Sequence, residues 1–393
     1  MKRFTQLERN YLNEVIDNEF NTSKNSIFCN QLESAFSNRI DMNYSIAHVN
    51  GTATMHTALA ALGVKQGDEV IVPPLTMSST ALAVLHNNSI PVFADVDRNT
   101  FNITEEGIEK CITEKTKAVI TVSLYGLAPD YDAISAICKK NNLYLIEDNA
   151  ESFLSYYKNK IVGSFGDFSS FSFQASKHLT CGEGGMLCTS NENFANEARR
   201  FSSLGYAGVS AKQGKITRND IQDPNYSRHV SLGFNYRLSE GNAAIVLGQL
   251  QRAEELVAVR VKVAEIFDQA IQGSSLFTKQ YTPNDCVNSY WAYSLVMNTD
   301  NPGADWYRFR DEFQKNGGDG YYAAWKLSYF EPLFLNDIQK YPGVWQKYKN
   351  GLCPNAEFLQ PRMLQLKTNY WNLSEAVAQA EILSKTIANF ARS

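Results

Sequence analysis

The 393-residue sequence has no block of lysine and arginine, and no apolar run long enough to cross a membrane. Its formal net charge is only −4, from 37 basic and 41 acidic residues that are interspersed along the chain. Surfaces that bind nucleic acid or anionic lipid usually carry concentrated positive charge. The sequence therefore predicts a protein that binds neither nucleic acid nor membrane.

The sequence also lacks a paired-cysteine motif. Its seven cysteines are scattered, with no CxxC pair: Cys29, Cys111, Cys138, Cys181, Cys188, Cys286 and Cys353. This spacing favours reduced thiols over disulfides or a metal site. Residues 1–10 contain no apolar segment of the kind found in a signal peptide. We therefore expect a cytoplasmic protein without a metal.

What the chain does have is enough apolar sequence for a large core. Hydrophobic residues make up 44% and charged residues 20%, which is ordinary for a globular protein. A chain of 393 residues is too long for one small domain. We expect a large domain over residues 1–250 and a smaller α/β domain over residues 251–393.

Short apolar runs alternate with amphipathic stretches between residues 44 and 190. The predicted strands are residues 45–49, 68–72, 91–95, 118–123, 143–147, 166–173 and 186–189. The predicted helices are residues 52–62, 78–85, 104–111 and 131–141. This alternation indicates an α/β fold with a mostly parallel seven-stranded sheet flanked by helices. Ligands bind such sheets beyond the carboxyl ends of the strands.

The second half of the chain predicts a long helix over residues 240–269, followed by the smaller domain. A strand is expected at residues 291–297, with helices at 306–316 and 374–391. This half is rich in aromatic residues, most of which we interpret as core of the smaller domain: Tyr290, Trp291, Tyr293, Tyr321, Tyr322, Trp325 and Tyr329.

Three segments at predicted strand ends carry candidate chemistry. Residues 50–54 (NGTAT) join a strand to a helix, whose N-terminal N–H groups either bind an anion or are merely capped. Asp148 follows an apolar strand, where a carboxylate either holds a protonated ring nitrogen or caps a turn. Lys177 lies in a turn after Ser172, and burial there would favour a neutral, nucleophilic amine. The alternative for Lys177 is an exposed loop lysine.

In this order and spacing, the segments resemble the DegT/DnrJ/StrS family of sugar aminotransferases, fold type I enzymes that depend on pyridoxal 5'-phosphate (PLP). The resemblance covers nearly the whole chain. The matching segments are residues 50–56 (NGTATMH), 67–73 (GDEVIVP), 91–97 (PVFADVD), 146–148 (IED), 172–177 (SFQASK) with 182–185 (GEGG), and 233–237 (GFNYR).

The resemblance implies a role for each matching position. Lys177 would carry the cofactor as a Schiff base, and Asp148 would pair with its ring nitrogen. Relatives that dehydrate sugars have histidine instead of this lysine, but the spacing places Lys177, not His178, at the cofactor. Asn235 would reach the phosphate from a second subunit, which implies a homodimer. The other groups expected at the phosphate are the backbone of Gly51, Thr52 and Ala53, and the Ser172 hydroxyl.

The sequence departs from the family's pattern at three places. Met77 stands where an aromatic residue often covers the cofactor ring, and a thioether can also do so. Glu151 stands near the cofactor where the family commonly has histidine or glutamine. Residues 317–325 (GGDGYYAAW) replace a segment with a histidine near the substrate. Glu151 and residues 317–325 favour a sugar without a nucleotide.

The resemblance implies transfer of an amino group from L-glutamate to a keto or aldehyde sugar, for cell-surface polysaccharide or natural-product sugars. A sugar dehydratase is an alternative that Lys177 weighs against. An amino-acid aminotransferase of the same fold would need an arginine that grips a carboxylate, and Arg308, Arg310 and Arg362 lie in no such motif. A regulatory protein without catalysis is disfavoured because Lys177 is retained.

Overall fold

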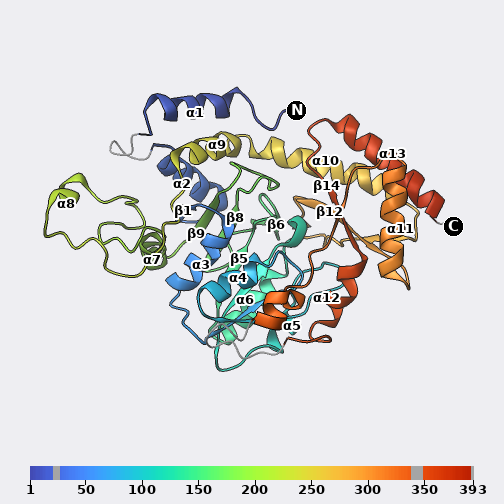
Figure 1. Cartoon of the computed structure of the whole chain (residues 1–393), viewed down its shortest axis with the longest axis horizontal. Helices are drawn as coiled ribbons and strands as arrows, with labels where there is room; N and C mark the ends of the chain where they lie inside the picture. The colour runs from blue at the N-terminus through green and yellow to red at the C-terminus, as the bar shows by residue number, and fades with distance from the viewer. Residues whose placement is uncertain (21–26, 338–347, 391–393) are drawn as a thin grey trace.

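The computed structural model describes residues 1–20, 27–337 and 348–390, and a seven-stranded sheet forms its centre (Figure 1). In spatial order the strands are β1 (Tyr44–His48), β9 (Gly185–Thr189), β8 (Phe168–Ser172), β5 (Tyr144–Asp148), β4 (Thr116–Val122), β2 (Glu69–Val72) and β3 (Ile90–Phe93). Strand β9 runs in the opposite direction to the other six strands of this sheet. The predicted α/β fold with a mostly parallel sheet is therefore confirmed.

Helices cover both faces of this sheet because its strands are apolar on both sides. Consecutive side chains of a strand point to opposite faces, so Ile46 packs into one core and Ala47 into another. The first core takes side chains from α3 (Gly51–Ala61), α4 (Ser79–His86), α5 (Glu105–Glu109), α6 (Tyr131–Lys140) and α7 (Glu192–Ser202). The second takes them from α1 (Gln6–Asp17), α2 (Ile27–Ile40), α9 (Glu240–Leu250) and α10 (Ala253–Ile271).

The long helix predicted over residues 240–269 is in fact two helices. Arg252 separates α9 from α10, with φ −121° and ψ 19°. Its guanidinium lies 3.0 Å from the Glu8 carboxylate and donates to the backbone oxygen of Lys2 at 3.1 Å. Arg252 thus ties the N-terminal segment to the junction of α9 and α10, a long-range contact that helical periodicity does not reveal.

A second, antiparallel sheet lies on the C-terminal side of the molecule (Figure 1). Its strands are β10 (Phe277–Lys279), β12 (Ala292–Met297), β14 (Met363–Lys367) and β13 (Tyr322–Ala323). Together with α10, the helices α11 (Pro302–Lys315) and α13 (Leu373–Phe390) enclose a third core with this sheet. Parts of the chain between residues 324 and 363 pack instead into the first core, as Tyr329 and Cys353 show.

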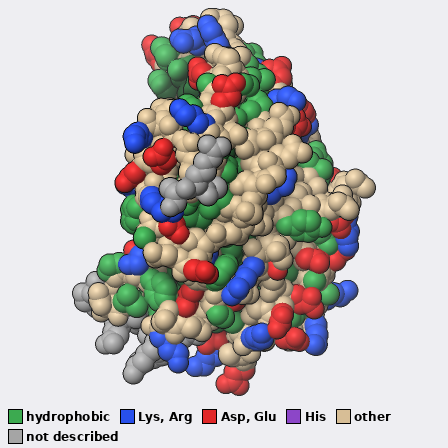
Figure 2. Space-filling model, turned by 90° about the vertical axis from the view of Figure 1, so that its right-hand side faces the viewer, with side chains coloured by type: hydrophobic (Ala, Val, Ile, Leu, Met, Phe, Trp, Pro, Cys, Tyr) green, Lys and Arg blue, Asp and Glu red, His purple; other side chains and the backbone are tan. Residues whose placement is uncertain are grey.

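Smaller elements complete the fold: a three-stranded sheet of β11 (Cys286–Val287), β6 (Tyr156–Tyr157) and β7 (Lys160–Ile161), and the short helices α8 (Arg218–Gln222) and α12 (Pro354–Leu359). The face that carries α11 and α13 mixes acidic and basic side chains without a block of either (Figure 2). Within the described ranges, no helix is both long and apolar enough to span a membrane.

Candidate active site

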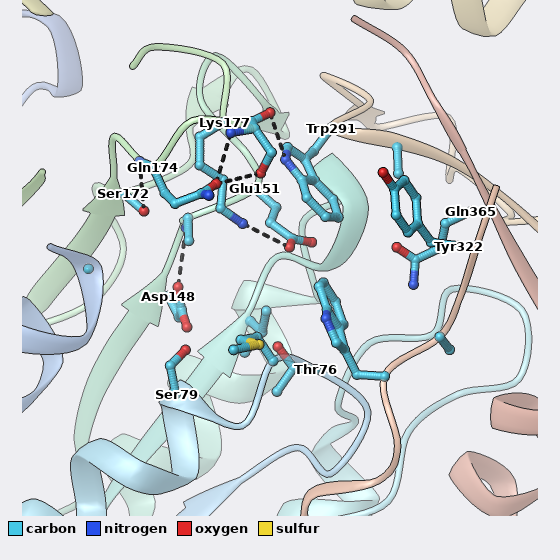
Figure 3. A pocket seen from close by; sticks show the side chains of 18 of the residues that line it. Thr76, Ser79, Asp148, Glu151, Ser172, Gln174, Lys177, Trp291, Tyr322 and Gln365 are labelled. Atoms are coloured by element: carbon cyan, nitrogen blue, oxygen red, sulfur yellow. Dashed lines mark hydrogen bonds and ion pairs between the residues drawn. The ribbon is translucent and has the colours of Figure 1, made fainter. Parts of the chain in front are cut away.

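A cavity of about 860 Å³ lies where the carboxyl ends of the parallel strands face the antiparallel sheet (Figure 3). Parallel strands end at one edge, so residues distant in sequence meet there. Asp148 ends β5, Ser172 ends β8, and Gly51 follows β1. The predicted site residues that line this one cavity are Gly51, Thr52, Met77, Asp148, Glu151, Ser172 and Lys177.

Lys177 lies in the turn between β8 and β9, and its amine points into the cavity (Figure 3). The side chain is 13% exposed. Its Nζ atom lies 3.1 Å from Glu151 Oε1 and 4.3 Å from the centroid of the Trp291 ring. These contacts exclude the alternative that Lys177 is an exposed loop lysine.

His178, the neighbour of Lys177, faces different surroundings. Its ring is buried, and Nε2 lies 3.1 Å from the backbone oxygen of Ser289. Burial, with the nearby charge of Arg260, holds the pKa of His178 well below its usual range, so the ring is neutral. Of the two neighbours, only Lys177 lines the large cavity.

Two arginines and a tryptophan hold the turn that carries Lys177. Arg3 donates to the backbone oxygen of Lys177 at 2.6 Å, and Arg260 donates to the same oxygen at 3.1 Å. Arg260 and the indole N–H of Trp291 both donate to Ser176 O, at 2.8 and 3.1 Å. Burial, with the charge of Arg3, lowers the pKa of Arg260 to about 9. The sequence did not single out Arg3 or Arg260, and Trp291 was interpreted as core, because the three residues come from distant segments.

Asp148 is a buried carboxylate at the carboxyl end of β5, in the wall of the cavity that the parallel strands form. It accepts hydrogen bonds from Thr80 Oγ1 at 2.9 Å and from the Ala150 N–H at 3.2 Å. Burial raises the pKa of Asp148 to about 6, although these hydrogen bonds and the charge of Lys177 act in the opposite direction. A cationic group placed beside it would stabilise its charged form.

The start of α3 and the end of β8 form an anion-binding corner. A Cβ atom on Gly51 would lie 3.0 Å from Ser172 Cβ, so glycine permits this close approach. The first N–H groups of a helix have no partner within the helix and can bind an anion. Asn50 Oδ1 already accepts from the Ala53 N–H at 2.8 Å. Ala53 accordingly does not line the cavity, whereas Gly51 and Thr52 do.

Two further predicted residues differ in their placement. Met77 lines the cavity and is 50% exposed, so its thioether can contact a ligand. Asn235 is exposed, does not line the cavity of its own chain, and accepts from Arg237 Nε at 2.9 Å. Its expected role at the phosphate of a second subunit stays a prediction.

Another wall of the cavity is aromatic. The rings of Trp291 and Trp325 stack with centroids 5.7 Å apart, and Trp291 stacks on Tyr125 at 6.2 Å. Gln365 Nε2 donates to Tyr125 Oη and to Ala323 O, both at 3.0 Å. These two bonds use both amide protons of Gln365. Its amide oxygen is a separate acceptor and can receive a hydrogen bond from a ligand.

The interpretation of the aromatic residues as core is right for some and wrong for others. Tyr293 and Tyr321 are buried in the core of the antiparallel sheet. Trp291, Tyr322 and Trp325 line the cavity instead. No local pattern separates the two groups, because the packing of distant segments decides which rings face the cavity.

Residues 3–380 match the DegT/DnrJ/EryC1/StrS aminotransferase family. The chain belongs to this family. Its members are PLP-dependent aminotransferases, so the predicted enzyme class and cofactor are confirmed. The match covers both sheets and every residue of the cavity described above.

Individual relatives agree with this assignment. GDP-perosamine synthase of Escherichia coli O157:H7 is 33% identical over 362 residues, which cover 92% of this chain and 90% of that protein. The spore coat polysaccharide biosynthesis protein SpsC of Bacillus subtilis is 33% identical over 337 residues, 86% of this chain and 83% of that protein. The crystal structure of an aminotransferase from Psychrobacter cryohalolentis superposes with a TM-score of 0.86 at 28% identity, over 99% of this chain and 98% of that one.

Proposed function

We propose that the protein transfers the amino group of L-glutamate to a keto or aldehyde sugar that enters cell-surface polysaccharide or a natural product. The observation that carries this proposal is the Lys177 amine, which faces a cavity and contacts its aromatic wall, formed by Trp291 and Trp325. Aromatic faces suit the C–H groups of a sugar ring. The names of the relatives, GDP-perosamine synthase and a polysaccharide biosynthesis protein, support a sugar.

PLP fits the residues of the cavity. The corner between Gly51 and Ser172 suits a phosphate, and the buried carboxylate of Asp148 lacks the cationic partner that a protonated ring nitrogen would provide. Bound there, the cofactor supplies an electron-poor ring that stabilises negative charge on the α-carbon of the amino donor. The residues that would hold it are Gly51, Thr52 and Ser172 at the phosphate, Asp148 at the ring nitrogen, Met77 on the ring face, and Lys177 by a covalent bond.

The side chains of the cavity have different roles in the proposed reaction. Lys177 takes a proton from the α-carbon of the donor as a general base, and later delivers a proton to the acceptor carbon of the sugar as a general acid. Asp148 stays charged beside its cationic partner, because that partner lowers its pKa. Trp291 and Trp325 orient the sugar and exclude water from the reacting atoms.

The charges near the aromatic wall favour an uncharged sugar ring there. Lys367 Nζ lies 2.6 Å from Asp319 Oδ2, and Arg260 is occupied by the backbone oxygens of the Lys177 turn. Among the described residues that line this wall, neither cation is left without an acceptor.

A homodimer is part of the proposal, with Asn235 of one chain completing the cavity of the other. The segment that carries Asn235 exposes apolar side chains: Val230 is 56% exposed, Leu232 82% and Phe234 38%. Such a patch suits a second copy of the chain. Arg237, bonded to Asn235, would bring a cation to the same interface.

We also propose that residues 1–250 and 251–393 form the large and small domains, and that the protein is cytoplasmic. The break between α9 and α10 and the separate third core support the division. All seven cysteines are free thiols, which supports a reducing compartment.

The function is tested by supplying PLP-loaded protein with 15N-labelled L-glutamate and a panel of acceptors. The panel contains a GDP-linked keto-deoxysugar, a keto-sugar phosphate, a free keto-sugar and 2-oxo acids. We expect 15N in a sugar product by mass spectrometry. The GDP-linked sugar should react best, in contrast to the expectation from Glu151 and residues 317–325, because GDP appears in the names of relatives. A sugar that loses oxygen without gaining nitrogen would show a dehydratase, and transfer to 2-oxo acids alone would show an amino-acid aminotransferase.

A further inference from the structure

The amine of Lys177 forms a buried ion pair with Glu151. Lys177 Nζ lies 3.1 Å from Glu151 Oε1, and the two side chains are 13% and 5% exposed (Figure 3). Little water reaches the pair, so the carboxylate acts on the amine with little screening. A histidine or glutamine at position 151 would place no negative charge there.

Glu151 is fixed so that one oxygen is left for the lysine. Its Oε2 atom accepts the backbone N–H of Tyr125 at 3.1 Å. Tyr125 is itself immobilised: it is fully buried, has φ +60°, stacks on Trp291, and its hydroxyl accepts from Gln365. Rigid support of this kind is what a group that handles protons needs.

The other charged and titratable groups around the pair have different partners. Asp148 accepts from Thr80 and from a backbone N–H, and its charge and that of Glu151 repel each other. Arg260 is directed at backbone oxygens, and burial raises the pKa of the Tyr125 phenol well above its usual range. Among the described residues, Glu151 is the carboxylate in hydrogen-bond contact with the Lys177 amine.

An ammonium group has no lone pair, so Lys177 must lose a proton before it can act as nucleophile or base. The proton can pass from Nζ to Glu151 Oε1: the nitrogen keeps the electron pair of the broken N–H bond, and the carboxylate becomes a neutral acid. We propose that Glu151 is a positioning residue that orients the Lys177 amine and exchanges this proton with it. The inference rests on the proposed role of Lys177 as the lysine that holds the cofactor.

A pH titration of the PLP-loaded protein without any substrate tests this. The absorption band of the bound cofactor changes when the nitrogen of its bond to Lys177 loses a proton. We expect Glu151→Gln to move the midpoint to lower pH by about one unit or more, because a negative charge that stabilises the protonated nitrogen is gone. Glutamine still offers an oxygen to the Tyr125 N–H, so the fold is retained.

The matched control is Glu183→Gln, which removes a carboxylate that lines the same cavity but is exposed and has no contact with Lys177. Its midpoint should move by less than about 0.3 units, since solvent screens an exposed charge. Equal midpoints for wild type and Glu151→Gln, or equal shifts in the two variants, would overturn the proposal.

A second measurement uses the cofactor-free protein. An amine-reactive reagent at pH 7 should label Lys177 several-fold faster in Glu151→Gln than in wild type, because the carboxylate that pairs with the amine is gone. Lys367 lines the same cavity and pairs with Asp319, and it serves as the internal reference in mass spectrometry. Unchanged labelling of Lys177 would overturn the proposal. Neither measurement uses a sugar, so both are independent of the proposed substrate.

Discussion

The two walls of the cavity are built in different ways. The strand-end wall consists of residues that end or follow neighbouring strands of one parallel sheet, such as Asp148 and Ser172. The aromatic wall is assembled from distant segments: Tyr125 and Gln365, whose side chains share a hydrogen bond, are 240 residues apart. Sheet topology fixes the first wall, whereas the second depends on how the antiparallel sheet packs against the first.

This difference suggests a division of labour. The groups proposed for proton transfer and cofactor binding lie on the wall that the sheet positions rigidly. The aromatic wall, made by β12, β13 and the segments beside them, can change its side chains without disturbing that chemistry. We therefore expect substitutions on the first wall to abolish the reaction, and substitutions on the second to change the preference among sugars.

The largest effect is expected for Lys177→Ala. Without the amine, turnover should fall below detection, because both the covalent hold on the cofactor and the proton-transfer group are lost. Borohydride should then no longer fix the cofactor to the chain, which mass spectrometry of the reduced protein measures directly. Lys367→Ala is the control: it removes another lysine of the same cavity and should leave fixation intact. Fixation that persists in Lys177→Ala would refute the assignment.

The residues of the two walls also differ in how well the sequence predicts them. Asp148 and Lys177 line the cavity because strands of a parallel sheet deliver the residues after them to one edge, although only the family resemblance favoured them over a turn cap and an exposed lysine. Trp291 could not be predicted, because an aromatic residue before a strand has the same local sequence whether it faces a core or a cavity. Arg260 was missed for a similar reason: its partners are backbone oxygens about 80 residues earlier, at separations of 83 and 84.

The next largest effect concerns stability and pH in the cofactor-free protein. Burial raises the pKa of Asp148 to about 6 in the folded chain, from an ordinary value of 3.8. The folded state therefore binds this proton more tightly than the unfolded state does. The resulting stabilisation is complete below the ordinary value and is lost as the pH rises through about 6. Its full size is roughly 2–3 kcal/mol.

Asp148→Asn removes the titrating group and should remove this pH dependence. Urea unfolding between about pH 4 and pH 7 measures it. The stability of wild type relative to the variant should fall with rising pH across that range, whatever constant offset the lost hydrogen bonds add. The difference between the two proteins cancels every other titrating group. Parallel curves would mean that Asp148 is not the buried carboxylate described here.

The smallest effect, and the sharpest test of the comparison, is expected for Trp325→Leu. Leucine keeps an apolar surface but loses the flat ring that stacks on Trp291. The KM for the sugar should rise roughly tenfold, equivalent to about 1.4 kcal/mol of lost binding. Borohydride fixation of the cofactor should not change, since the Lys177 amine contacts the ring of Trp291, which this substitution keeps.

Trp371→Leu serves as the control for Trp325→Leu, because Trp371 is a partly buried tryptophan that packs near Arg3 and does not line the cavity. It should leave the sugar KM within about twofold of wild type, as substitutions away from a binding surface usually do. If Trp325→Leu instead lowered cofactor fixation and left the sugar KM unchanged, the two walls would not be independent. The aromatic wall would then support the Lys177 turn, through the stack of Trp325 on Trp291 and the bond from Trp291 to Ser176 O.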